Sequence, residues 1–79
     1  MYYLLITENT GGLANACVRF FTDREKASEM AQKGLKARSE IMSDDANVIR
    51  GDNFVAVEND GEDGLDSIRW EIGEVVTEA

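Results

Sequence analysis

Carboxylates are the most numerous side chains capable of chemistry in this sequence, and most of them lie in its second half. The chain has 16 aspartates and glutamates against 8 lysines and arginines, a net charge of −8. Residues 1–42 have a balance of +1, whereas residues 43–79 have eleven acids against Arg50 and Arg69, a balance of −9. Such an asymmetry repels nucleic acid and anionic membranes and attracts basic surfaces. We therefore expect the acidic half to bind a basic partner.

Carboxylates on an extended strand form rows, because alternate residues share a face about 6.6 Å apart. One DNA strand carries a phosphate about every 3.4 Å along the axis, so two adjacent rows with an acidic loop would approach that spacing. The pattern predicts an anionic patch that occupies a basic groove meant for nucleic acid, and a surface that only keeps the protein in solution is the alternative. The predicted partner-binding residues are Asp52, Glu58, Asp60, Glu62, Asp63, Asp66, Glu71 and Glu74.

Other chemistry has little support in the sequence. The chain has one cysteine, Cys17, and no histidine, so the usual zinc ligand sets and thiol–imidazole pairs cannot form within it. The segment Asn59 to Asp66 has calcium-type oxygen ligands, but Trp70 falls where a calcium loop needs a bidentate glutamate. Two carboxylates could act as acid and base, but so short a chain leaves little room for a shaped pocket. We predict no catalytic residue, no metal site and no cofactor.

Length and composition also indicate the number of domains and the compartment of the protein. Seventy-nine residues fit one domain over residues 1–79. The longest apolar runs, such as residues 2–6, are far below the roughly 18 residues that cross a bilayer, and no basic segment precedes an apolar one at the N-terminus. A single cysteine cannot form a disulfide within the chain. We expect a cytoplasmic protein without a membrane partner.

Two strands are predicted at the start of the chain. Residues 1–7 are rich in aromatic and aliphatic side chains and apolar on both faces, which predicts a central strand. Residues 8–12 include two adjacent glycines that tolerate positive φ, which predicts a loose hairpin loop before a second strand over residues 14–21. In that second strand Ala16, Val18 and Phe20 make one face apolar, while the other face is mixed.

A helix is predicted after residue 22. Thr22 and Glu25 fit a capping box, in which each side chain accepts from the backbone amide of the other residue. Gly34 costs about 1 kcal/mol relative to alanine inside a helix, so we expect it to permit a close approach to the sheet. Arg38, at the edge of the apolar stripe, is expected to reach water instead of forming a buried ion pair. The stripe has three- and four-residue spacing and comprises Ala27, Met30, Ala31, Gly34, Leu35, Ile41 and Met42.

Three further strands complete the predicted fold. Residues 48–50 and 54–58 predict a hairpin around residues 51–53, followed by a polar loop over residues 59–66. Residues 67–76 predict the last strand, with Ile68, Trp70 and Ile72 on one face and a bulge at Gly73. The predicted class is α+β, a single helix packed on a mostly antiparallel sheet in the order β-β-α-β-β-β.

That arrangement leaves one face of the sheet without a covering layer. We expect Tyr3 or Phe21 on this far face to anchor a protein interface, with a partner or with a second copy of the chain in a homodimer.

In size, acidity, predicted architecture and lack of catalytic residues the chain resembles phage-encoded inhibitors, especially the anti-CRISPR proteins. The resemblance is one of architecture and charge over the whole chain. It implies a protein partner with a Lys/Arg-lined groove, such as a CRISPR effector subunit whose target DNA binding is blocked by mimicry, and no direct binding of nucleic acid. The opening residues 1–8, the Gly-Gly turn, the second strand and a helix containing Ala27 are also similar to the start of HicB-type antitoxins. That second resemblance implies the alternative of an antitoxin or regulatory module that neutralises a basic toxin.

Overall fold

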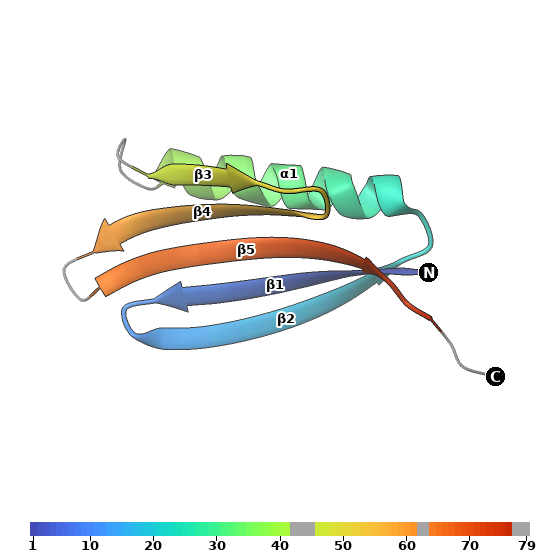
Figure 1. Ribbon diagram of the computed structural model, residues 1–79, viewed down its shortest axis with the longest axis horizontal. Coiled ribbons are helices and arrows are strands. Elements are labelled where there is room, and N and C mark those ends of the chain that lie inside the picture. The colour runs from blue at the N-terminus through green and yellow to red at the C-terminus, as the bar shows by residue number, and fades with distance from the viewer. Residues whose placement is uncertain (42–45, 62–63, 77–79) are drawn as a thin grey trace.

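The described residues form one five-stranded antiparallel sheet with a single helix against one face (Figure 1). This computed structural model describes residues 1–41, 46–61 and 64–76. The strands lie in the order β2-β1-β5-β4-β3, so the central strand is β5, and β1, predicted to be central, lies beside it between β2 and β5. The predicted α+β class and element order are confirmed. The elements are β1 (Tyr2–Thr10), β2 (Leu13–Phe21), α1 (Arg24–Ile41), β3 (Asn47–Arg50), β4 (Phe54–Gly61) and β5 (Gly64–Glu74).

The loop between β1 and β2 is a tight turn, so the predicted loose loop is wrong. The two strands pair without interruption from Tyr2 opposite Phe21 to Thr10 opposite Leu13. Only two residues remain between them, Gly11 with φ 58° and Gly12 with φ 80°. Two-residue turns with positive φ at both positions match the right-handed twist of antiparallel strands, which explains why the pairing continues to the turn.

Substitution of Gly12 by alanine is expected to destabilise the protein by about 1–2 kcal/mol. A Cβ at this position would meet nothing within 4 Å, so the cost comes from the left-handed backbone alone. Asparagine tolerates that conformation better, so Gly12→Asn should lose less stability. Urea denaturation followed by circular dichroism measures both changes. Equal losses for alanine and asparagine would contradict a backbone origin.

The helix begins one residue later than the predicted capping box requires. The backbone N–H of Glu25 donates to Asp23 Oδ1 at 2.9 Å, and α1 starts at Arg24. Asp23 is therefore the N-cap, and the prediction of Thr22 in that role is wrong. A carboxylate at this position both accepts from the free helix amides and is favoured by the helix dipole, so it competes well with the neighbouring hydroxyl.

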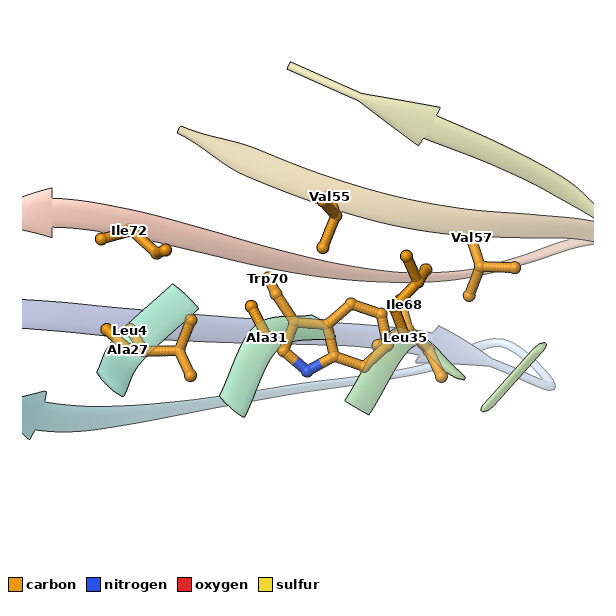
Figure 2. Close-up of a cluster of buried hydrophobic side chains, with 9 residues drawn as sticks. All are labelled: Leu4, Ala27, Ala31, Leu35, Val55, Val57, Ile68, Trp70 and Ile72. Atoms are coloured by element: carbon orange, nitrogen blue, oxygen red, sulfur yellow. The ribbon is translucent and has the colours of Figure 1, made fainter. Parts of the chain in front are cut away.

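The hydrophobic core lies between α1 and strands β1, β4 and β5 (Figure 2). Ile68, Trp70 and Ile72 share the core face of β5, as predicted. A Cβ on Gly34 would lie only 2.7 Å from Trp70 Nε1, which confirms that this glycine permits close approach of the helix to the sheet. The buried cluster comprises Leu4, Ala27, Ala31, Leu35, Val55, Val57, Ile68, Trp70 and Ile72.

Polar contacts at the surface attach the helix to the sheet. Arg38 pairs with Glu8 of β1 at 3.5 Å, and both side chains stay partly exposed, so Arg38 forms no buried ion pair, as predicted. Arg50 of β3 donates to Gln32 Oε1 of α1 at 3.0 Å. No helix in the described ranges is long and apolar enough to cross a membrane.

The β4–β5 hairpin is longer than predicted. Its strands pair continuously from Phe54 opposite Glu71 to Gly61 opposite Gly64, so most of the predicted polar loop over residues 59–66 is strand. Cross-strand pairing therefore overrides the low strand propensity of these polar residues and glycines.

Gly73 does not form the predicted bulge, because it pairs with Tyr3 in an unbroken register. A Cβ on Gly73 would collide with the Tyr3 ring. The missing side chain instead lets that ring lie over the backbone of β5.

Candidate functional site

The predicted acidic residues are distributed over both faces of the sheet. Strand residues alternate between faces, and the core residues Ile68 and Ile72 identify the face under α1. Asp66 and Glu74 hold core-side positions in β5, whereas Glu71 lies on the opposite face. Glu58, next to the buried Val57, also lies on the opposite face, and Asp52 lies in the turn between β3 and β4.

The described carboxylates therefore do not form one continuous row. Glu62 and Asp63 lie outside the described residues, and only the backbone of Asp60 is described. Two of the others already have partners within the protein. Asp66 Oδ1 accepts from the backbone N–H of Gly11 at 3.0 Å and so holds the β1–β2 turn, while Glu71 Oε1 lies 3.3 Å from the guanidinium of Arg69. The described acids therefore do not form the two adjacent rows on one face that the mimicry prediction requires.

The face of the sheet opposite α1, here called the open face, has an apolar patch over β1 and β2. Tyr3 lies opposite Phe20 and Leu5 lies opposite Val18 in the pairing of these strands, so the four side chains are neighbours. Phe20 is 60% exposed and Val18 is 48% exposed. No described segment covers them. These four residues form a contiguous apolar surface.

The structure confirms the predicted position of Tyr3 and corrects that of Phe21. Phe21 lies opposite Tyr2, shares the face of Leu4 and packs against the core. Val18 and Phe20 are site residues that the sequence did not reveal, although the apolar character of their face of β2 was the signal that could have found them. That alternation alone cannot tell which face the helix will cover.

The centre of the open face carries a polar cluster next to the apolar patch. The guanidinium carbon of Arg69 lies 4.2 Å from the centroid of the Phe54 ring, and Arg69 also pairs with Glu71. Ala56, directly opposite Arg69, is only 7% exposed. Arg69 is therefore held between an aromatic ring and a carboxylate, and its charge is largely compensated.

Nearly all of the basic residues lie on the side of the sheet that α1 covers. Arg69 lies on the open face, and the other seven of the eight basic residues lie in α1 or at core-side positions of the edge strands. The open face is therefore nearly free of uncompensated positive charge. The seven residues are Arg19, Arg24, Lys26, Lys33, Lys36, Arg38 and Arg50.

Other chemistry has no described cluster to support it. Among the residues that the structure describes, no group of three or more Asp, Glu, Cys or His side chains is placed to hold a metal ion. Comparison of the chain with models of protein families, with curated proteins and with solved structures finds no match. Any functional proposal must therefore come from the surfaces of the molecule itself.

Proposed function

We propose that this is a non-catalytic binding protein whose open face docks on a partner protein. The observation that carries the proposal is the apolar patch of Tyr3, Leu5, Val18 and Phe20. Single exposed apolar side chains are common on protein surfaces, whereas contiguous ones mark interaction sites. Aromatic side chains such as Tyr3 and Phe20 are typical anchors at the centre of such interfaces.

The charge of the molecule favours a basic partner over a second copy of the chain. Two copies would each carry −8, and like net charges oppose association. The partner would have an apolar depression surrounded by Lys and Arg. The depression would contact the apolar patch, and the surrounding Lys and Arg would contact Glu58 and Glu71. The apolar contact would supply most of the affinity, and the net charge would speed the encounter.

Basic surfaces of this kind are common in proteins that bind nucleic acid, so the proposed partner is such a protein. The protein would inhibit such a partner by covering its basic surface, as the resemblance to anti-CRISPR proteins implies for a CRISPR effector complex and its target DNA. A basic toxin would present similar chemistry, so the antitoxin role is the alternative. In either role the apolar patch, and not a phosphate-like row of carboxylates, is the main contact.

The test combines inhibition of DNA binding with a matched pair of double variants. Val18→Ser with Phe20→Ser removes the exposed part of the patch without changing the net charge. Leu13→Ser with Val48→Ser is the control, because these exposed apolar residues hold core-side positions on the two edge strands. Target DNA binding by a type I effector complex is measured by gel mobility shift. Loss of the anchor Phe20 together with its neighbour Val18 should weaken inhibition by about 100-fold or more, and the control should inhibit like the wild type.

Each alternative has a distinct outcome in this test. If the patch variant inhibits as well as the wild type while Glu58→Gln with Glu71→Gln does not, charge mimicry is the mechanism and the apolar proposal is wrong. No inhibition by the wild type rejects this effector as the partner. Sedimentation that shows a dimer, lost in the patch variant alone, would assign the open face to a second copy of the chain.

A further inference from the structure

A groove lies between α1 and β2, on the side of the sheet opposite the open face. The helix packs over β1, β4 and β5, so the core-side residues Cys17 and Arg19 of the edge strand β2 remain exposed. The groove has a volume of about 580 Å³ and lies between these elements. That volume is within the range of about 300–1,000 Å³ that is common for small-molecule sites.

The walls of this groove are cationic, in contrast to the protein as a whole. Arg19 of β2 and Lys26 and Lys33 of α1 line it, with Glu29 as the one acidic residue. None of the three cations has an ion-pair partner among the described residues. Unpaired cations around a concave surface raise the local concentration of anions, even when the net charge of the protein is negative.

The floor of the groove is apolar and carries one hydrogen-bond donor. Ile6, Phe21 and Met30 are partly buried against the core, and Trp70 is only 4% exposed. Trp70 Nε1 has no acceptor among the described residues. Every fully buried side-chain nitrogen or oxygen in the described chain has a partner, so Nε1 must remain in contact with solvent.

The direction of that donor is visible in Figure 2. The indole nitrogen lies on the edge of the ring turned toward β1 and β2, which is the side of the groove. An indole N–H can donate but cannot accept. A ligand that covers it must therefore bring an acceptor or leave a buried donor unpaired, which is costly.

We propose that this groove binds an organic carboxylate with an apolar body, of the size of a medium-chain fatty acid or an aryl acid. The carboxylate pairs with the cations Arg19, Lys26 and Lys33 and accepts from Trp70 Nε1. The apolar body lies on the floor of Ile6, Phe21 and Met30. An acidic peptide fits less well, because its own backbone groups would need polar partners on a floor that supplies one donor. This site is separate from the open face and independent of the proposed function.

Trp70 is the one tryptophan of the chain, so its indole N–H gives a single reporter signal. We expect decanoate, titrated into the ¹⁵N-labelled protein, to shift the indole N–H cross-peak to saturation. Decanol, which has the same chain without the charge, should produce little shift at the same concentration. No saturable shift with decanoate, or an equal response to decanol, would overturn the proposal.

Variants of equal net charge distinguish ion pairs formed in the groove from the electrostatic attraction of the protein as a whole. Arg19→Gln with Lys26→Gln and Lys33→Gln should weaken decanoate binding by about tenfold or more, because three exposed ion pairs are lost. Arg24→Gln with Lys36→Gln and Arg50→Gln has the same net charge but leaves the groove intact, and it should bind like the wild type. Equal weakening in both would reject a local site. A hexaglutamate peptide that shifts the indole signal when decanoate does not would assign the groove to acidic peptides and overturn the small-ligand proposal.

Discussion

Replacement of Trp70 by alanine is expected to lower the free energy of unfolding by about 3–5 kcal/mol. Trp70 is almost completely buried at the centre of the core, where it contacts Gly34 of the helix. Truncation of a buried tryptophan costs about 3–5 kcal/mol, because the lost apolar burial is added to the cost of a cavity. A chain of this length has a total stability of roughly 4–12 kcal/mol, so the loss is a large part of it.

Urea denaturation followed by far-ultraviolet circular dichroism measures this change, since the variant has no tryptophan fluorescence. Trp70→Phe should lose less stability because it fills part of the site. Val48→Ala, at an exposed position on β3, should change the free energy of unfolding by less than about 0.5 kcal/mol. A Trp70→Ala variant with the stability of Val48→Ala would show that the helix and the sheet do not depend on this contact.

Gly34→Val should also destabilise the protein strongly, although Gly34 lies inside a helix. On helix propensity alone, replacement of a glycine by alanine gains about 1 kcal/mol. Here a Cβ would lie 2.7 Å from Trp70 Nε1 and 2.8 Å from Trp70 Cε2, and the buried ring has little room to move. Overpacking costs about 1–3 kcal/mol, and the branched valine should lie at the upper end of that range. Gly34→Ala should lower the free energy of unfolding less, because the gain in helix propensity offsets part or nearly all of the cost of the clash.

A double-mutant cycle identifies the cause of that loss. Phenylalanine lacks the indole atoms that lie nearest to position 34, so Trp70→Phe should remove part of the clash with valine. The two substitutions together should therefore cost less than the sum of their separate effects, measured as free energies of unfolding in urea. Strict additivity would show that Gly34→Val acts on the helix itself and not through the contact with Trp70.

The two proposed binding surfaces, the open face and the cationic groove, lie on opposite sides of the sheet and differ in chemistry. The open face presents an apolar patch with acidic neighbours, whereas α1 and the face of the sheet on its side carry seven of the eight basic residues and the cationic groove. The net charge of −8 describes neither surface by itself. Variants in one layer can therefore be tested without altering the other.

Local patterns in the sequence determined most of the fold. The period of two in residues 67–76 placed Ile68, Trp70 and Ile72 on one face, and the three- and four-residue spacing after residue 22 placed Ala27, Ala31 and Leu35 on the buried side of α1. The predicted stripe residue Met42 lies outside the described residues. The same patterns predicted the element order and the close approach at Gly34. These features depend on neighbours within a few residues, and their geometry is the same in any helix or strand.

Only the tertiary structure decided where the functional surfaces lie. Alternation in β2 shows that Ala16, Val18 and Phe20 share a face, but long-range packing of α1 decides whether that face is core or surface. The acidic residues follow the same rule. Asp66 and Glu74 share the face of Ile68 and Ile72 on β5, which becomes the core side because α1 packs there, and Glu71 is left on the other face. The cationic groove needs β2 and α1 in contact. Strand pairing and helix placement join residues distant in the chain, so no local pattern specifies them.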